Sequence, residues 1–272
     1  MDASRASAVR LRLGRQLARE QGAAALTAMF AVEPLMVPVA LTLDTEIGAD
    51  LLGRRRRIDT EKHERARATF DAAAQEPGDP APVWAEVDGE LPTEDFLQAA
   101  VYADLLVLGQ YDEHDPQTHD VPDDFVEAVI LGSGKPALVV PHAGDIQVTG
   151  RNVVIAWKPG REAAHAVASA LPILRHAERV QVHTWGRDEF PLAKSSLGIE
   201  RYLQWHGVKA TLQRHADAPR DIGAALLDQA KRAGADLIVM GCYGHSRVRE
   251  LVLGGATRTV LASMTVPVLM AH

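Results

Sequence analysis

The sequence predicts an α/β protein made of two consecutive halves, each an open parallel sheet with helices on both faces. Short apolar runs alternate with segments of helical periodicity along the chain, which is typical of parallel sheets. The chain also repeats itself: residues 103–109 read ADLLVLG and residues 235–241 read ADLIVMG. We therefore predict a tandem duplication, with one domain at residues 1–143 and a second at residues 150–272.

The first half opens with an Arg-rich amphipathic segment that lacks the apolar run of a signal peptide, so we predict a helix at residues 4–21. A long polar helix follows at residues 46–74. Its four arginines at residues 54–57 resemble a basic patch, but they lie in a mixed-charge helical run, and we expect a solvated face. Apolar runs predict strands at residues 25–32, 83–87, 104–108 and 137–140.

The second half contains one strand more than the first. Apolar runs rich in β-branched residues predict strands at residues 152–157, 179–184, 209–214, 236–240 and 266–271. Apolar residues at helical spacing predict helices between them, at residues 161–176, 192–206, 219–233 and 255–264. This strict alternation indicates a parallel, doubly wound sheet.

Glycines gather where the fourth strand of the second half ends. Gly241 and Gly244 follow that strand, and after nine intervening residues Gly254 and Gly255 stand at the start of the last helix. Glycine lets backbone N–H groups approach a phosphate closely, and the N–H groups at a helix start attract anions. This layout predicts a binding site for nucleotide phosphates.

The spacing Gly-x2-Gly-x9-Gly, closed by the strand at residues 266–271, resembles the ATP-binding signature of the universal stress protein family. The resemblance implies a tandem, Rossmann-like protein with sheet order 3-2-1-4-5, a role in the stress response, and ATP as the ligand, with Mg²⁺ as a companion ion. It places the nucleotide contacts in the second half, at Met240, Gly241, Gly244, His245, Gly254, Gly255, Ala256 and Lys158.

Two positions depart from the family pattern. The Ser or Thr that usually follows the third glycine is Gly255, and Thr257 lies about 200° further round the helix, so we expect it to point elsewhere. The aspartate that contacts the adenine end of the nucleotide is Lys158 here. Lys158 could approach phosphates at the carboxyl edge of the sheet, although we favour a solvated lysine on a turn.

The first half lacks a counterpart of the strand at residues 152–157. Aligning the two halves places that counterpart before Met1, in the middle of a sheet of order 3-2-1-4-5. Either the chain starts late or the first half folds around a gap, and we expect a late start because unpaired ladder groups are costly. Family dimers pair through the last strand, so we expect residues 137–140 and 266–271 to pair antiparallel as an intramolecular pseudo-dimer, with a homodimer as a further option.

The glycine loop is not kept in the first half. Asp2 stands in the register of the family's aspartate, but QYDEHD, residues 110–115, follows Gly109, and Asp123 and Asp124 replace the second glycine pair. Carboxylates there would repel a polyphosphate, so we expect no nucleotide in this half. The same loop offers ligands for a hard metal ion, yet its spacing fits no metal motif, and we expect an acidic loop without metal.

Composition limits the classes of partner. A formal net charge of −7 gives no reason to expect nucleic acid, and no apolar run approaches the length of a membrane span. The single cysteine, Cys242, excludes an intramolecular disulfide and indicates a reducing cytoplasm. Its place in the glycine loop could make it redox-sensitive, whereas most single cysteines are inert.

No catalytic motif is found, neither a nucleophile elbow, nor His-Glu-x-x-His, nor a P-loop lysine. We therefore expect a cytoplasmic regulatory protein that binds an adenine nucleotide through its second half and is at most a weak ATP hydrolase. An interaction or scaffold protein with both sites degenerate is the alternative, favoured by Gly255 and Lys158. An adenylyl-transferring enzyme would need a signature near the first strand that the sequence lacks.

Overall fold

The structure is a computed structural model that describes residues 1–31, 45–78, 80–87, 92–118, 121–144, 146–186, 198–243 and 255–272. It divides into two compact units. The first unit comprises Met1–Ala100 and Tyr111–Val129, and the second comprises Val101–Gln110 and Ile130–His272. The units differ from the predicted domains because two strands of the first half belong to the sheet of the second, and the domain boundary at the linker stays a prediction.

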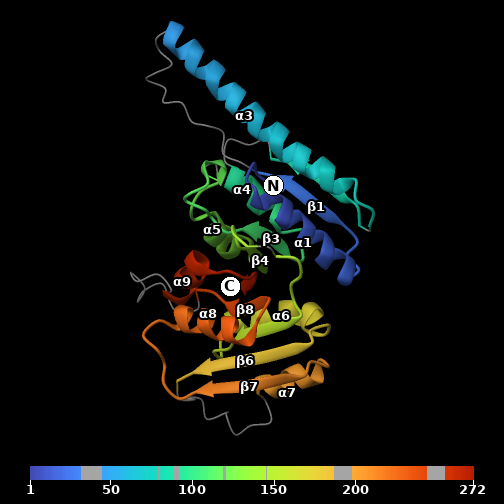
Figure 1. Ribbon diagram of the computed structural model, residues 1–272, viewed down its shortest axis with the longest axis vertical. Coiled ribbons are helices and arrows are strands. Elements are labelled where there is room, and N and C mark those ends of the chain that lie inside the picture. The colour runs from blue at the N-terminus through green and yellow to red at the C-terminus, as the bar shows by residue number, and fades with distance from the viewer. Residues whose placement is uncertain are drawn as a thin grey trace. The chain divides into compact units, whose positions relative to one another are not determined.

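A seven-stranded sheet is the framework of the second unit (Figure 1). Its strands are β3 (Leu106–Gly109), β4 (Ala137–Val140), β5 (Asn152–Ala156), β6 (Arg179–Trp185), β7 (Ala210–His215), β8 (Leu237–Gly241) and β9 (Val268–Ala271), and their spatial order is β3-β4-β9-β8-β5-β6-β7. The five strands of the second half pair in parallel in the order 3-2-1-4-5. The fold predicted for this half is therefore confirmed.

Helices lie between the strands of the second half as the periodicity predicts. In its described residues they are α6 (Arg161–Leu174), α7 (Ile199–Trp205), α8 (Ile222–Ala233) and α9 (Gly255–Ser263). The Asp221 carboxylate caps α8 by accepting the Ala224 N–H at 3.0 Å, and the helix ends at Gly234 with φ 60°, a left-handed conformation that suits glycine. The predicted start of α7 falls partly in residues 187–197, outside the described residues.

The core of the second unit lies along the middle of this sheet. Every residue of β4 and β9 is buried, as are four of the five residues of β8. Strands covered on both faces read as continuous apolar runs, which is why these three were easy to find in the sequence. β7, at the edge of the sheet, is partly exposed along its length.

The last strands of the two halves pair as predicted. β4 and β9 are antiparallel, with Leu138 opposite Leu269. Gln110, directly after β3, adds a second tie: its Nε2 donates to the carbonyl oxygen of Leu261 in α9 at 2.7 Å, and its Oε1 accepts the His142 N–H at 3.1 Å. The β4–β9 pairing covers an edge that each half would otherwise expose.

The first unit contains a two-stranded parallel sheet of β1 (Leu26–Phe30) and β2 (Pro82–Glu86). Its helical elements are α1 (Ala6–Glu20), α3 (Thr45–Ala74), α4 (Pro92–Ala100), the short 3-10 helix η1 (Pro116–Thr118) and the start of α5 (Phe125–Ser133). In the described part of the chain, β1 pairs only with β2. The strand β3, which belongs to the second unit, pairs with no strand of the first half other than β4. Among the described residues of this half, no strand lies between these two pairs, where the first strand of the predicted order would be.

The C-terminal part of α3 packs on the first unit, where Phe70 forms a small core with Leu11 of α1 and Ala28 of β1. The N-terminal part carries the arginine run. Arg54 and Arg55 there make ion pairs with aspartates one turn away. These pairs favour a solvated, mixed-charge face over a nucleic-acid patch.

Within the described residues, no helix combines the length and the apolar character that crossing a membrane requires.

Candidate nucleotide site

The carboxyl ends of β5 and β8 lie side by side. Ala156 of β5 pairs with Met240 of β8, so Lys158 and Gly241 leave neighbouring strands at the same edge of the sheet. Ligands of open α/β sheets bind at this edge. Met240 itself is buried, with 5% of its surface exposed, so only its backbone could meet a ligand. Lys158 is exposed.

Gly241 lies where β8 meets the first turn of α6. A Cβ atom at this position would lie 2.5 Å from the Ala163 nitrogen and 2.6 Å from the Glu162 carbonyl carbon. Any side chain would therefore push α6 away from the sheet. Packing alone requires this glycine, whether or not a phosphate binds beside it.

Backbone and histidine contacts fix the chain directly after Gly241. The Cys242 N–H donates to the Ala271 carbonyl at 3.0 Å, and the Cys242 carbonyl accepts from Nδ1 of His272 at 3.1 Å. His165 of α6 in turn donates from Nδ1 to the His272 carbonyl at 3.0 Å. The Cys242 thiol is buried, and Tyr243 turns the chain with φ 55°, which is uncommon for a residue other than glycine.

The start of α9 is open. Gly255 is exposed, and a Cβ atom there would meet no atom within 4 Å. Ala256 is half-buried, and Thr257 is buried with 3% of its surface exposed. Thr257 thus points away from the helix start, as its position on the helix predicts, and it does not replace the family's hydroxyl.

Glu162 is a residue of this edge that the sequence did not single out. It lies in the first turn of α6, is 8% exposed, and accepts from Arg161 Nε at 2.6 Å. Burial acts to raise the pKa of Glu162, but the bond from Arg161, a backbone N–H and the Arg161 charge outweigh burial and hold that pKa below its ordinary value. An ionised carboxylate therefore lies beside Gly241. The sequence could have singled out Glu162, because it is an acidic residue in the first turn of a helix, just after the N-cap Gly160.

Three predicted contacts fall outside the described residues: Gly244, His245 and Gly254. The structure thus brings together Lys158, Met240 and Gly241 at one sheet edge and gives Gly255 and Ala256 an open helix start. The loop between these two parts carries the remainder of the predicted site.

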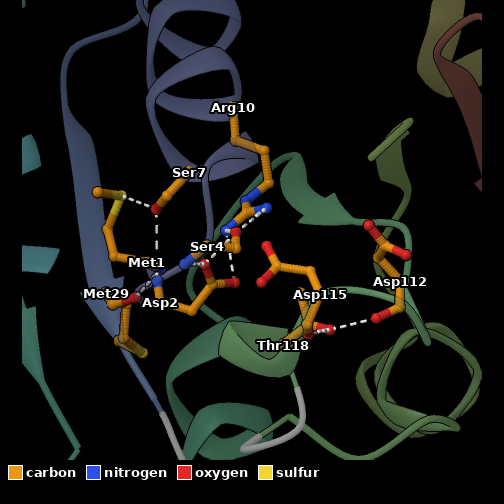
Figure 2. Close-up of polar contacts among 9 residues, drawn as sticks. All are labelled: Met1, Asp2, Ser4, Ser7, Arg10, Met29, Asp112, Asp115 and Thr118. Atoms are coloured by element: carbon orange, nitrogen blue, oxygen red, sulfur yellow. Dashed lines mark hydrogen bonds and ion pairs between the residues drawn. The ribbon is translucent and has the colours of Figure 1, made fainter. Parts of the chain in front are cut away.

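The corresponding edge of the first half is filled by its own side chains (Figure 2). Arg10 of α1 forms an ion pair with Asp2, and the Asp2 carboxylate also accepts the Ser4 N–H at 2.9 Å. Burial acts to raise the pKa of Asp2, but the Arg10 charge and the Ser4 hydrogen bond outweigh it and hold that pKa well below its ordinary value. In Figure 2 the Asp115 carboxylate is directed toward this group.

The acidic loop of the first half is closed on itself. The single Thr118 hydroxyl proton is shared between the carbonyl oxygens of Asp112 and Asp115, which lie 2.6 and 2.8 Å from Oγ1. The Asp112 carboxylate accepts the His114 N–H, and the Asp115 carboxylate accepts the Gln117 N–H. Of the residues described, no three His, Cys, Asp or Glu side chains are grouped to hold a metal ion; His119 and Asp120 lie outside them. Asp123 and Asp124 are exposed.

Comparison with known proteins identifies the second half. The model of the Universal stress protein family matches residues 151–272. A curated relative, universal stress protein Slr1230 of Synechocystis sp. (strain ATCC 27184 / PCC 6803 / Kazusa), is 28% identical over 173 residues, 61% of this chain and 57% of the relative. The matched part thus spans little more than half of that relative's length.

One solved structure extends the likeness to both halves. The crystal structure of a universal stress protein from Archaeoglobus fulgidus DSM 4304 has a TM-score of 0.63 at 15% identity, and the match covers 94% of this chain and 90% of that chain. At this identity the likeness shows the shared fold alone. The sequence match therefore gives residues 151–272 as a universal stress protein domain, and the shared fold extends over both halves of the chain.

Proposed function

We propose that the protein is a stress-response protein that binds one ATP molecule, with Mg²⁺, at the carboxyl edge of its second half. The observation that carries this proposal is the open helix start at Gly255, joined through the glycine loop to the end of β8. The first N–H groups of a helix have no intrahelical partner and attract anions.

Charge at the two edges favours the second half as the binding half. In the first half, the buried Arg10 is already paired with the Asp2 carboxylate, and the Asp115 carboxylate lies beside this pair. An incoming polyphosphate would have to break the ion pair and would be repelled by both carboxylates. In the second half, Lys158 is an exposed cation at the matching position.

Mg²⁺ fits the second-half edge because Glu162 is ionised there. A polyphosphate would meet the negative charge of this carboxylate, and a divalent cation held by the phosphates would reduce the repulsion. We expect Mg²⁺ to arrive with ATP rather than to occupy a site formed by the protein alone.

We propose a regulatory rather than a catalytic role, in the cytoplasm. Among the described residues of this edge, Glu162 is engaged by Arg161, and both histidines near the loop use Nδ1 to hold backbone carbonyls. A general base must be within hydrogen-bond reach of the proton it takes, and none of these groups is paired with a nucleophile.

The second candidate is an interaction protein with two degenerate sites. The packing around Gly241 favours it, because that glycine would be kept for the contact with α6 even without a nucleotide. The missing hydroxyl at Gly255 points the same way.

Calorimetric titration of ATP into the full chain and into Gly255→Asp tests the proposal. The new carboxylate fits without a clash, and an acidic residue at a helix start stabilises the helix, so the fold should persist. Facing the phosphates, it should weaken ATP binding at least about tenfold.

Gly198→Asp is the matched control. Gly198 is the N-cap of α7, also in the second half, and a Cβ atom there meets nothing within 4 Å. This variant adds the same charge at another helix start and should bind ATP like the wild type. A wild type without detectable ATP binding would favour the interaction protein instead.

A further inference from the structure

Three aromatic rings lie together at the carboxyl ends of β6 and β7. Trp185 and His215 are paired residues of the two strands, and their rings are nearly parallel, with centroids 5.1 Å apart at an angle of 14°. This is an offset stack. His183, two residues before Trp185 on the same face of β6, has its ring at 28° to the indole.

The two imidazoles lie edge to edge beneath this stack. His183 Nδ1 and His215 Nε2 are 3.0 Å apart, and the rings differ by only 17°. Their centroid separation, 5.3 Å, exceeds the N···N distance by about the width of one ring, so the rings lie edge to edge in nearly one plane. Gln181 Oε1, 3.3 Å from His183 Nε2, accepts from that nitrogen, which leaves Nδ1 to accept from His215.

This cluster of three rings borders the candidate nucleotide site. His183 is paired with Ala156, and its carbonyl accepts the Trp157 N–H at 2.9 Å, next to Lys158. β5 lies between β6 and β8, so the distance from the end of β8 to that of β6 is two strand spacings, about 10 Å. Trp185 and His215 are partly exposed, whereas His183 is buried.

We propose that the partly exposed ring of Trp185, held in place by its stack with His215, stacks against the base of the bound nucleotide. This inference rests on the proposed function, since the phosphates must lie at the glycine loop for the base to extend across β5. The universal stress protein pattern has an aspartate that contacts the adenine end of the nucleotide, and this chain has Lys158 at that position. The ring of Trp185 would give the base a contact in place of that aspartate. Stacking on aromatic rings suits any base, because each has a flat π face.

ATP affinity of full-length variants tests the inference. Trp185→Ala should weaken ATP binding roughly five- to hundredfold, the range expected for removing one base–aromatic stack, while Trp185→Phe should retain most of the affinity. Inorganic tripolyphosphate, used as a competitor without a base, should bind wild type and Trp185→Ala alike. Trp205→Ala is the control, because this tryptophan is 62% exposed on α7, away from the sheet edge.

Tryptophan fluorescence gives a readout independent of affinity. ATP should quench the emission of the wild type and of Trp205→Phe, and the quenching should be largely lost in Trp185→Phe even though that variant still binds. Wild-type affinity in Trp185→Ala, with ATP bound, would overturn the stacking inference and leave the proposed function intact. A wild type that binds tripolyphosphate no more weakly than ATP would also overturn it, and one that binds neither would overturn both.

Discussion

The missing side chain of Gly241 sets the geometry where β8 meets α6. Its neighbours Ala163 and Glu162 lie so close that any Cβ atom would separate helix and sheet. The sequence marks the position as a glycine of a phosphate motif, and the structure adds a packing reason for the same residue. A glycine of a binding motif can thus also be required by the packing of the fold.

Acid should destabilise the protein through His183. Burial, followed by the neighbouring His215, lowers the pKa of His183 below the ordinary value of about 6.5. Below that pH the unfolded chain takes up a proton that folded His183 resists, so the free energy of unfolding falls as the pH falls; above it the contribution is fully present. Thermal unfolding followed by circular dichroism at pH 7 and pH 5 measures this loss.

His183→Gln should lose less stability than the wild type between these two pH values, although it is less stable at pH 7. His114→Gln is the matched control, because 84% of the His114 side chain is exposed. An acid sensitivity of His183→Gln as large as that of the wild type would contradict this assignment.

At the scale of elements, one carboxylate joins the end of the linker to β8. The Asp236 carboxylate accepts the backbone N–H groups of Gly150, Arg151 and Asn152, at 2.8, 2.9 and 3.1 Å. Thr149 adds a bond from its hydroxyl to the Asp236 carbonyl at 2.9 Å. These contacts fix where β5, the central strand of the second half, begins.

Asp236→Ala should therefore lower the free energy of unfolding by about 2–4 kcal/mol, because three backbone N–H groups lose a charged acceptor. Urea denaturation of the full chain measures the change. Asp228→Ala is the control: its ion pair with Arg232 is solvent-exposed and should contribute less than about 1 kcal/mol. Equal losses of unfolding free energy in the two variants would show that the Asp236 hydrogen bonds stabilise the fold no more than an exposed ion pair does.

The elements were largely predictable from the sequence, and many side-chain contacts were not. Buried parallel strands such as β8 and β9 are continuous apolar runs, so hydropathy alone finds them. The hydrogen bond between Gln110 and Leu261 joins residues 151 positions apart. Hydrophobic periodicity indicates which residues are buried, but it does not identify the residue that each one contacts. His183 and Trp185 could have been noticed, since they alternate with the buried Val182 along β6.

At the scale of the whole molecule, the described strands of the first half fall into two separate pairs. One part is the two-stranded sheet of β1 and β2, and the other, β3 and β4, joins the second half through β9. Two-stranded sheets have little stability alone, so β3 and β4 depend on β9 for a core. The two halves of the repeat are therefore unequal in how they can fold.

A fragment of residues 1–143 should aggregate or unfold without a cooperative transition, whereas residues 150–272 should be folded. The cut removes β9 from β4 and leaves the described strands of the first fragment as two separate pairs. Circular dichroism during heating, with light scattering for aggregation, distinguishes the two. A cooperative transition of fragment 1–143 at a temperature as high as that of fragment 150–272 would contradict this dependence.

The central claim is that one half of a duplicated chain binds the nucleotide. Equilibrium dialysis of the full chain against labelled ATP and Mg²⁺ tests it most directly, because saturation gives the number of sites. We predict one ATP per chain, since the Asp2–Arg10 pair fills the first-half edge and the helix start at Gly255 is open. Two equivalent sites per chain, or no saturable binding, would contradict the claim.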